Sequence, residues 1–269
     1  MYYRRKILIV TKTYPSISTK YKETVCTAGV LLDDDETPLQ WIRIYPIRFR
    51  DLNSDQKYKK WSIISAEIKK DEKDYRQESY KINDESIQVI RQIKTDNNWE
   101  ERKSFLFPLK FESVNDIQGK GKSLGLIKPK TIKRSYLQED DRDWKPKQQA
   151  ILDQGDLFEP SADIEKIPYK FGYEFTEFGD INHRYSIIDW EILQLYRNCR
   201  NSSKARKLED KEKEAVEKVR EKLEDYFLQK RDIYFLVGNL KRYPKTFLII
   251  GIFYPPKLPE NETIQIELF

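Results

Sequence analysis

The sequence contains a single histidine, two cysteines and no long apolar run. Because Cys26 and Cys199 are far apart and His183 stands alone, a structural zinc site of Cys and His ligands is not expected. The longest apolar stretch, residues 246–254, is much shorter than the roughly 20 residues that cross a bilayer. We therefore expect no membrane segment, two reduced thiols and a cytoplasmic location.

The common nucleotide-binding and hydrolase motifs are also missing. The chain has no Walker loop, no Rossmann glycine fingerprint and no Gly-x-Ser-x-Gly. Charge and aromatic side chains are plentiful instead: 35% of residues are charged, 13% are aromatic, and the mean hydropathy is -0.79. The aromatic content argues against wholesale disorder, and 269 residues are enough to bury a sizeable core.

The formal net charge of +5 is unevenly distributed along the chain. Residues 1–137 hold 28 Lys and Arg against 19 Asp and Glu, a balance of +9, whereas the remainder holds 22 against 26, a balance of -4. A positive surface attracts phosphate polymers. The basic N-terminal half therefore favours a nucleic-acid partner. The predicted partner is DNA, and the charge does not distinguish single-stranded from double-stranded DNA.

The hydrophobic pattern predicts an α+β fold: a β-rich N-terminal barrel or curved sheet, then a smaller α/β part with a long amphipathic helix and a C-terminal β-hairpin. The long helix is expected over residues 204–230, and Asp189 is expected to cap a helix that begins at Trp190. The predicted strands are Lys6–Thr13, Thr24–Leu32, Leu39–Pro46, Trp61–Lys69, Phe105–Lys110, Tyr169–Thr176, Asp180–Ile188, Asp232–Gly238 and Thr246–Tyr254.

Composition divides the chain into four segments. Residues 1–137 form the basic β-rich domain and residues 138–167 a polar, proline-containing segment typical of a linker. Residues 168–256 form the α+β domain, and residues 257–269 form a polar tail.

Two short peptides in the linker-like segment and the tail resemble the docking motifs that bacterial proteins use to bind the sliding clamp. In that family of motifs a glutamine fixes the register while adjoining leucine and phenylalanine side chains fill apolar subsites. Two such peptides on one chain could raise avidity on a ring with repeated pockets. The alternative is that both peptides pack on the protein's own core. The resemblance implies clamp contacts by Gln154, Asp156, Leu157, Phe158, Gln265, Leu268 and Phe269, with departures from the motif at Gly155, Ile266 and Glu267.

Cations alternate with aromatic residues in two stretches, residues 43–50 and 57–61, as they do on surfaces that stack single strands. A flexible basic loop follows at residues 119–125. Strands with aromatic cores and lysine surfaces produce the same mixture. The predicted nucleic-acid contacts are Arg48, Arg50, Lys59, Lys60, Lys120 and Lys122.

Catalytic candidates are weaker. Glu67 and Lys69, with Asp51 or Asp55 upstream, loosely resemble the Asp…Glu-x-Lys arrangement of restriction-type nucleases, in which carboxylates hold Mg²⁺. Surface charge explains the same residues, and no metal ligand or cofactor is assigned unless this alternative holds. His183 is the one histidine that could act as a general base, with hydrogen bonding as its structural alternative.

The sequence therefore favours a bacterial DNA-associated accessory protein of replication, repair, mobile elements or phage defence, which docks on the sliding clamp and contacts nucleic acid through its basic half. The alternatives are a metal-dependent nuclease of a defence or mobile-element system and a nucleotide or modified-base sensor. The sequence does not decide whether the chain is an enzyme.

Overall fold

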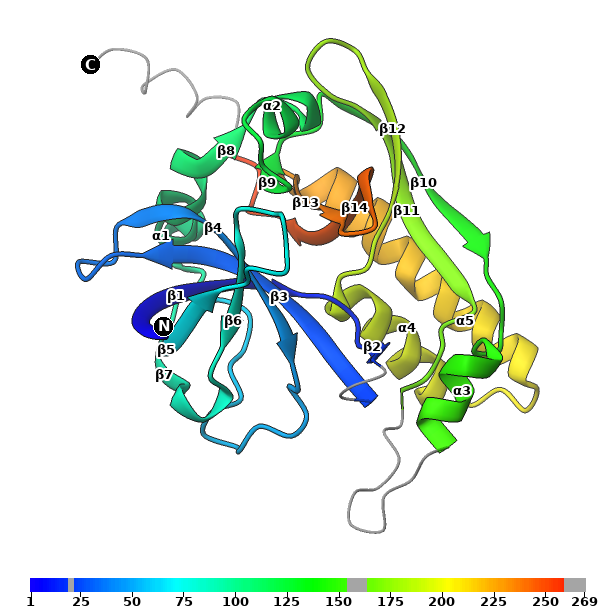
Figure 1. The fold of residues 1–269 in the computed structure, drawn as a ribbon. Helices are drawn as coiled ribbons and strands as arrows, with labels where there is room; N and C mark the ends of the chain where they lie inside the picture. Colours follow the sequence, from blue (N-terminus) through cyan, green and yellow to red (C-terminus); the bar gives the residue numbers. More distant parts are fainter. Residues whose placement is uncertain (19–21, 154–163, 259–269) are drawn as a thin grey trace.

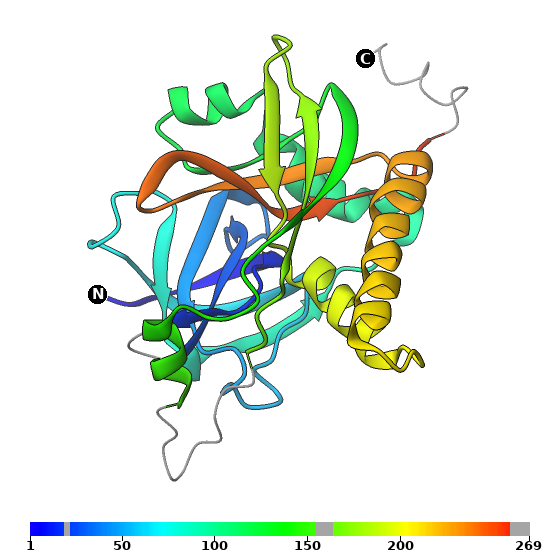
Figure 2. The same cartoon turned by 90° about the vertical axis from the view of Figure 1, so that its right-hand side faces the viewer.

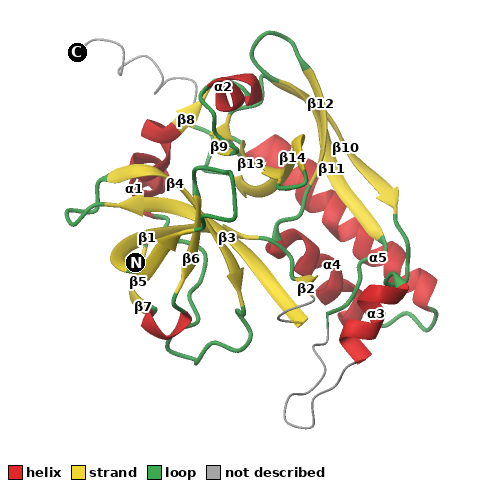
Figure 3. Ribbon diagram, in the orientation of Figure 1, coloured by secondary structure: helices red, strands yellow, loops and turns green. Residues whose placement is uncertain are grey.

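The computed structural model describes residues 1–18, 22–153 and 164–258 of the chain. They form a five-stranded β-barrel followed by a mixed α/β region that ends in a β-hairpin, as the sequence predicts (Figures 1 and 3). Among the described residues, no helix has the length and apolar character needed to span a membrane.

The barrel closes because β1 pairs antiparallel with both β3 and β5. The circuit is completed by β4, which pairs with β3 and, in parallel, with β6, and by β6, which pairs with β5. Two further strands, β2 and β7, extend the sheet at β3 and β5. The elements are β1 (Tyr3–Lys12), β2 (Ser16–Ser18), β3 (Lys22–Leu32), β4 (Pro38–Ile47), β5 (Ser62–Lys70), β6 (Ser79–Ile82), η1 (Asp84–Ser86) and β7 (Gln88–Gln92).

The four consecutive apolar residues of β1 are explained by burial on both faces. Successive strand residues point to opposite sides. Ile7 and Ile9 therefore enter the barrel interior, while Leu8 and Val10 face outward against a second layer. That layer is a four-stranded sheet in the order β14-β13-β9-β8.

The second sheet is itself buried on both faces, so its strands also read as continuous apolar runs. On β13, Tyr234 and Leu236 pack toward the barrel, whereas Phe235 and Val237 pack on the opposite side. In the sequence, α1 (Asp96–Leu106) and η2 (Phe107–Leu109) follow the barrel strands and precede this sheet. The strands of the sheet are β8 (Lys110–Phe111), β9 (Leu124–Ile127), β13 (Tyr234–Leu240) and β14 (Tyr243–Phe253).

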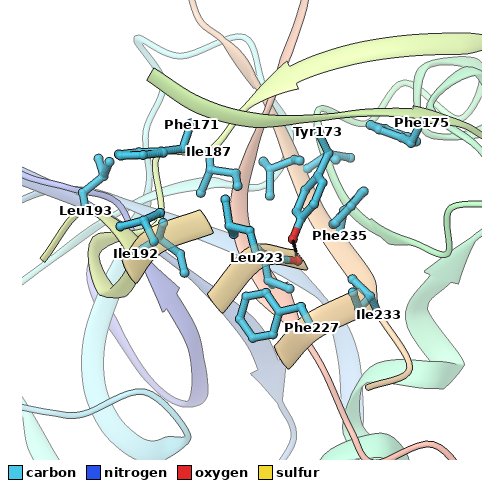
Figure 4. Packing of buried hydrophobic residues seen from close by; sticks show 14 of the residues in the cluster. Phe171, Tyr173, Phe175, Ile187, Ile192, Leu193, Leu223, Phe227, Ile233 and Phe235 are labelled. Atoms are coloured by element: carbon cyan, nitrogen blue, oxygen red, sulfur yellow. Dashed lines mark hydrogen bonds between the residues drawn. The ribbon is translucent and has the colours of Figure 1, made fainter. Parts of the chain in front are cut away.

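The third layer consists of a three-stranded sheet and the long helix. Tyr173 stacks on Phe235 with ring centroids 5.3 Å apart, and its hydroxyl donates to the Leu223 carbonyl at 2.7 Å, as Figure 4 shows. Figure 2 shows the long helix on one side of the three-stranded sheet. The elements are α2 (Val114–Gly119), β10 (Thr131–Glu139), α3 (Pro146–Asp153), β11 (Tyr169–Thr176), β12 (Asn182–Ser186) and α4 (Trp190–Ser202), with α5 (Leu208–Glu221) continued by a π-helical turn, η3 (Lys222–Leu228).

The long helix and the Asp189 cap agree with the sequence. The two joined segments make a 21-residue helix whose buried residues include Ala215, Val219, Leu223 and Phe227, spaced four apart on one face. Asp189 accepts a hydrogen bond from the Glu191 amide at 2.9 Å and so caps α4.

The strand predicted over Phe105–Lys110 is wrong. Phe105 and Leu106 end α1, residues 107–109 form a 3₁₀ turn, and the short β8 begins only at Lys110. A short apolar run does not distinguish strand from helix. Pro108 lacks the amide that a central strand must donate, and it favours the start of a turn instead.

Two strands connect the segments that meet at residue 137: β9, which precedes it, pairs with β13, and β10, which spans it, pairs with β11. Within the linker-like segment, β10 extends to Glu139 and α3 spans Pro146–Asp153. Arg142 from this segment makes two hydrogen bonds of 2.9 Å with the buried carboxylate of Glu212 on α5. The predicted division into domains stays a prediction.

Candidate nucleic-acid interface

Three segments that are far apart in the sequence meet beside one end of the barrel. They are the β5–β6 loop (residues 71–78), the turn after α2 (residues 120–123) and the β13–β14 hairpin end (residues 239–245). The Asn239 amide donates to the Ser123 carbonyl at 3.0 Å, and Lys122 Nζ donates to Gln77 Oε1 at 2.8 Å. Both overall views place the cyan loop near the hairpin (Figures 1 and 2).

A buried polar network beneath the exposed side chains holds these three segments together. Arg76 forms a bidentate pair with Asp74, at 2.9 Å from Nε to Oδ1 and 2.6 Å from Nη2 to Oδ2. The third guanidinium nitrogen of Arg76 donates to the Asn239 carbonyl at 3.0 Å. Burial opposes ionisation of Asp74, but hydrogen bonds from Arg76 outweigh it and lower the pKa of Asp74 to about 2.

Arg43 extends this network into the barrel wall. It is 3% exposed, and its Nη2 donates to the Ser123 carbonyl at 3.1 Å. The Ser123 amide in turn donates to the buried Glu78 carboxylate at 2.6 Å. These buried hydrogen bonds join the loop, the turn and the hairpin and favour one arrangement of the three segments, although Glu78 Oε2 and Asn239 Oδ1 have no partner among the described residues.

The exposed side of the three segments carries two tyrosines and several cations. Tyr75 is 59% exposed and Tyr243 is 63% exposed. The Tyr75 hydroxyl donates to the Lys241 carbonyl at 3.2 Å, and Lys241 Nζ donates to the Lys73 carbonyl at 2.6 Å, so the loop and the hairpin brace each other. We call this group the Tyr75–Tyr243 surface; it comprises Lys73, Tyr75, Lys120, Lys122, Lys241, Arg242, Tyr243 and Lys245.

The Tyr75–Tyr243 surface is positively charged. Residues 119–123 and 239–245 contain five Lys and Arg and no Asp or Glu. Arg242 and Lys245 are exposed and form no ion pair with any residue that the structure describes. The β5–β6 loop holds two cations against four carboxylates, so the three segments together carry a balance of +3. On this loop Asp74 is paired with Arg76 and Asp71 with Lys81. Lys120, in contrast, lies 3.0 Å from Asp116. Exposed aromatic rings beside cations are features that bind single-stranded nucleic acid.

Of the six predicted nucleic-acid contacts, Lys120 and Lys122 lie on the Tyr75–Tyr243 surface. Arg48, Arg50 and Lys59 lie on the β4–β5 connection, which Figure 1 shows at the opposite end of the barrel from α2. Arg48 is 3.9 Å from Asp51, and Arg50 is 3.1 Å from the buried Glu23. The structure therefore separates the predicted contacts into two groups.

Lys60 belongs to neither exposed group. Its side chain is 12% exposed, and its Nζ lies 3.0 Å from both Asp189 Oδ2 and Glu191 Oε2. Burial disfavours the charge, but the two carboxylates outweigh burial and raise the pKa of Lys60. This contact ties the barrel to the start of α4.

Lys12 lies beside that ion pair in an aromatic setting. Its Nζ is 3.6 Å from the ring centroid of Phe49 and 5.1 Å from that of Trp190. Burial lowers the pKa of Lys12 to about 8, with Glu191 acting in the opposite direction. The cluster therefore contains one lysine held charged by carboxylates and one destabilised by burial.

The comparisons with known proteins concern the two parts of the chain separately. Residues 110–269, more than half of the chain, match the family model described as domain of unknown function DUF8757. The chain belongs to the DUF8757 family. Residues 3–108 match a second model, domain of unknown function DUF8758. The two matches meet just before β8, and no curated protein matches the chain.

The predicted nuclease residues lie on or near the outer face of the barrel. Glu67 accepts a hydrogen bond from Asn83 Nδ2 at 3.1 Å, and Lys69 Nζ lies 4.6 Å from the Tyr2 ring centroid. Asp55 is exposed on the β4–β5 connection, and Asp51 lies near Arg48. Within residues 1–18, 22–153 and 164–258, no three His, Cys, Asp or Glu side chains gather in a way that could hold a metal ion.

His183 lies beside a carboxylate that the sequence did not suggest. Its Nε2 lies 3.0 Å from Glu177 Oε1, and its ring packs between Phe175 and Tyr185 at 5.3 and 4.9 Å. Glu177 is fully buried and accepts the Val114 amide at 2.8 Å. The pair joins the β11–β12 hairpin to the start of α2. Asp189 and Glu191, its neighbours in sequence, bind Lys60 instead.

Sequence reasoning missed Tyr75 and Tyr243. The signal was present in the hairpin, where Lys241, Arg242 and Lys245 surround Tyr243 in the same cation–aromatic mixture that drew attention to residues 43–50 and 57–61. The hydrogen bond from Tyr75 to the Lys241 carbonyl, however, depends on a pairing of segments that only the fold reveals. Both predicted docking peptides lie outside the described residues, at residues 154–158 and 265–269.

Proposed function

We propose that this protein binds single-stranded nucleic acid through the Tyr75–Tyr243 surface and is localised on DNA by the bacterial sliding clamp. It would be a DNA-associated accessory protein of the bacterial cytoplasm, acting in replication, repair, mobile-element movement or phage defence. The observation that carries the proposal is the gathering of two exposed tyrosines and six cations from three segments over a rigid buried network.

The aromatic rings and the cations would make separate contributions to binding. Each exposed ring offers a face on which a base stacks, worth about 1–3 kcal/mol per base. The cations neutralise phosphates and release counterions, which makes binding depend on salt. Because the buried network holds the loop and the hairpin that carry Tyr75 and Tyr243 in place before binding, less conformational entropy is lost when the strand docks.

The clamp part of the proposal rests on the two peptides. Gln154 to Phe158 and Gln265 to Phe269 each keep the glutamine and the Leu-Phe pair that fill the clamp pocket in the motifs they resemble. Clamp binding would determine where the protein acts, and the Tyr75–Tyr243 surface would determine what it holds there.

Nucleic-acid binding is tested by fluorescence anisotropy with a labelled single strand and the matching duplex at several salt concentrations. Tyr75→Ala and Tyr243→Ala should each weaken single-strand binding by about 5- to 150-fold. Arg242→Gln and Lys245→Gln should each reduce the magnitude of the log K against log salt slope by about 0.7. Tyr2→Ala is the matched control, because Tyr2 is an exposed tyrosine that is not among the eight residues of this surface.

Unchanged affinity in the Tyr75→Ala/Tyr243→Ala double variant would contradict the nucleic-acid part.

The clamp part is tested by pull-down on purified clamp, with Leu157→Ala/Phe158→Ala and with residues 265–269 deleted. Each change should weaken capture, and the combination should abolish it. Full capture by the combined variant would contradict docking without affecting the result on nucleic acid.

The two alternatives have their own measurements. A nuclease would show Mg²⁺-dependent cleavage that is lost in Glu67→Ala and retained in Asp34→Ala, which changes an exposed carboxylate elsewhere on the barrel. A nucleotide or modified-base sensor would bind a free nucleotide more tightly than an oligonucleotide. The described side chains around Glu67 favour neither over the nucleic-acid proposal.

A further inference from the structure

A second candidate binding site lies where the turn between β9 and β10 meets the residues that follow η3. It is an open hollow of about 250 Å³. Its lining is Lys128, Pro129, Lys130, Ile132, Leu228, Arg231, Asp232 and Ile233. None of these residues belongs to the Tyr75–Tyr243 surface.

The hollow has an excess of positive charge. Three cations, Lys128, Lys130 and Arg231, line it with a single carboxylate, Asp232. Asp232 is already engaged, since its Oδ1 lies 2.9 Å from Lys128 Nζ and its Oδ2 accepts from the Tyr234 hydroxyl at 2.8 Å. Lys130 pairs at 2.7 Å with Asp180, but both side chains are more than half exposed, so solvent weakens that pair.

Arg231 is the fixed element of the site. Its Nη2 donates to the Tyr226 hydroxyl at 2.5 Å, and its guanidinium carbon lies 4.8 Å from the centroid of the Tyr226 ring. Its backbone is held as well, because its amide donates to the Phe227 carbonyl and it forms an isolated β-bridge with Pro256.

One donor of this arginine is unused. Arg231 Nε is buried and has no hydrogen-bond partner among the described residues. Leaving a charged donor unpaired costs free energy, and a small rotation that turned the covered Nε toward the adjoining hollow would let a bound acceptor recover it. An anion would accept this hydrogen bond and would also neutralise the surrounding positive charge.

We propose that this hollow binds a terminal phosphate monoester. Such a group carries a charge of about -1.5 to -2 at pH 7, which matches the surplus left by three cations and one carboxylate. Its oxygens can bond Arg231 and the two lysines, while Ile132, Leu228 and Ile233 contact the less polar part of the ligand. The volume is slightly below that of pockets for drug-sized molecules, so the ligand is small or is the end of a longer one.

Two sources supply this chemistry: a free mononucleotide and the 5′-phosphate end of a nucleic-acid strand. The site does not depend on the Tyr75–Tyr243 surface, and each can fail without the other. Titration calorimetry with the full chain, using inorganic phosphate, AMP and adenosine, tests the free ligand. Anisotropy with 5′-phosphorylated and 5′-hydroxyl strands of one sequence tests the strand end.

AMP should bind and adenosine should not. Arg231→Gln should weaken AMP binding by about 10- to 100-fold, and Lys130→Ala, a change at an exposed side chain, should weaken it by a smaller factor without affecting folding. Lys133→Ala is the matched control, because Lys133, three residues further along on β10, is exposed and does not line the hollow. Preference for the 5′-phosphorylated strand that is lost in Arg231→Gln would assign the site to strand ends.

Three outcomes would overturn the proposal. The first is adenosine binding as tightly as AMP. The second is AMP affinity that is unchanged in both Arg231→Gln and Lys130→Ala, with folding verified by circular dichroism. The third is a chain that binds neither inorganic phosphate nor AMP and does not distinguish the two strand ends.

Discussion

Replacing Lys12 with methionine should stabilise the protein near neutral pH. Lys12 is a half-buried cation on β1, packed over Phe49 and next to the ion pair of Lys60. Methionine is of similar length and apolar, so it can fill the same space without a charge. We expect the free energy of unfolding of Lys12→Met to exceed that of the wild type at pH 7.

The magnitude follows from the pKa. Burial lowers the pKa of Lys12 from its ordinary 10.5 to about 8, and this difference corresponds to about 3 kcal/mol against the charged form in the folded state. Loss of the contact between the Lys12 cation and Phe49 offsets about 0.5–2 kcal/mol of this gain. The net stabilisation at pH 7 is therefore about 1–3 kcal/mol.

The dependence on pH is the sharper part of this prediction. Between the folded pKa of about 8 and the unfolded pKa of 10.5, the unfolded chain binds more protons at Lys12, so the wild type gains stability as the pH rises. At pH 7 the lysine is charged in both states and the full destabilisation applies. Raising the pH to 9.5 should therefore shrink the gap between Lys12→Met and wild type by about 2 kcal/mol.

Urea unfolding followed by tryptophan fluorescence at pH 7 and 9.5 measures this gap. Comparing variant with wild type at each pH cancels the tyrosines and other groups that titrate in both proteins. Lys59→Met is the matched control, because Lys59 is an exposed lysine nearby, and its gap should not vary with pH. A gap that stays constant between the two pH values, or a Lys12→Met protein that is less stable at pH 7, would refute the reasoning.

Two further predictions concern stability. A Cβ at position 172 would lie 2.3 Å from the Tyr185 carbonyl oxygen, a backbone atom, so Gly172→Ala should destabilise by at least about 1–3 kcal/mol in thermal unfolding. Gly119→Ala is its control: nothing lies within 4 Å, so that variant should be neutral or slightly more stable, and equal melting temperatures for the two would contradict the close approach at Gly172. Asp189→Asn keeps a residue that can cap α4 but removes one carboxylate from Lys60, so it should lower the free energy of unfolding at pH 7 by less than the about 3–5 kcal/mol of a fully broken buried pair. Unchanged urea unfolding in Asp189→Asn would show that Glu191 alone satisfies Lys60.

The elements predicted correctly are those with strong local signals. Tyr169, Phe171, Tyr173 and Phe175 alternate with more polar residues, and this period of two is the β11 strand. Asp189 before Trp190 has the chemistry of a helix cap, and it is one. Such signals need no knowledge of the rest of the fold.

The elements that could not be predicted depend on long-range pairing. Closure of the barrel depends on β1 pairing with β5, about sixty residues later, and no local pattern specifies that register. The ion pairs of Lys60 could not be predicted either, because its carboxylate partners lie at the start of α4, far along the chain. Tyr75 and Tyr243 come together for the same reason, since the loop and the hairpin belong to different sheets.

The apolar layer between the barrel and the β14-β13-β9-β8 sheet has a consequence for how the chain unfolds. Leu8 and Val30 come from the segment that matches one family model, and Leu126 and Leu236 come from the segment that matches the other, yet all four share one hydrophobic cluster. Separating the segments would expose that cluster to water. The two family segments should therefore melt in a single cooperative transition, and a fragment cut near residue 109 should aggregate rather than persist as an independent domain.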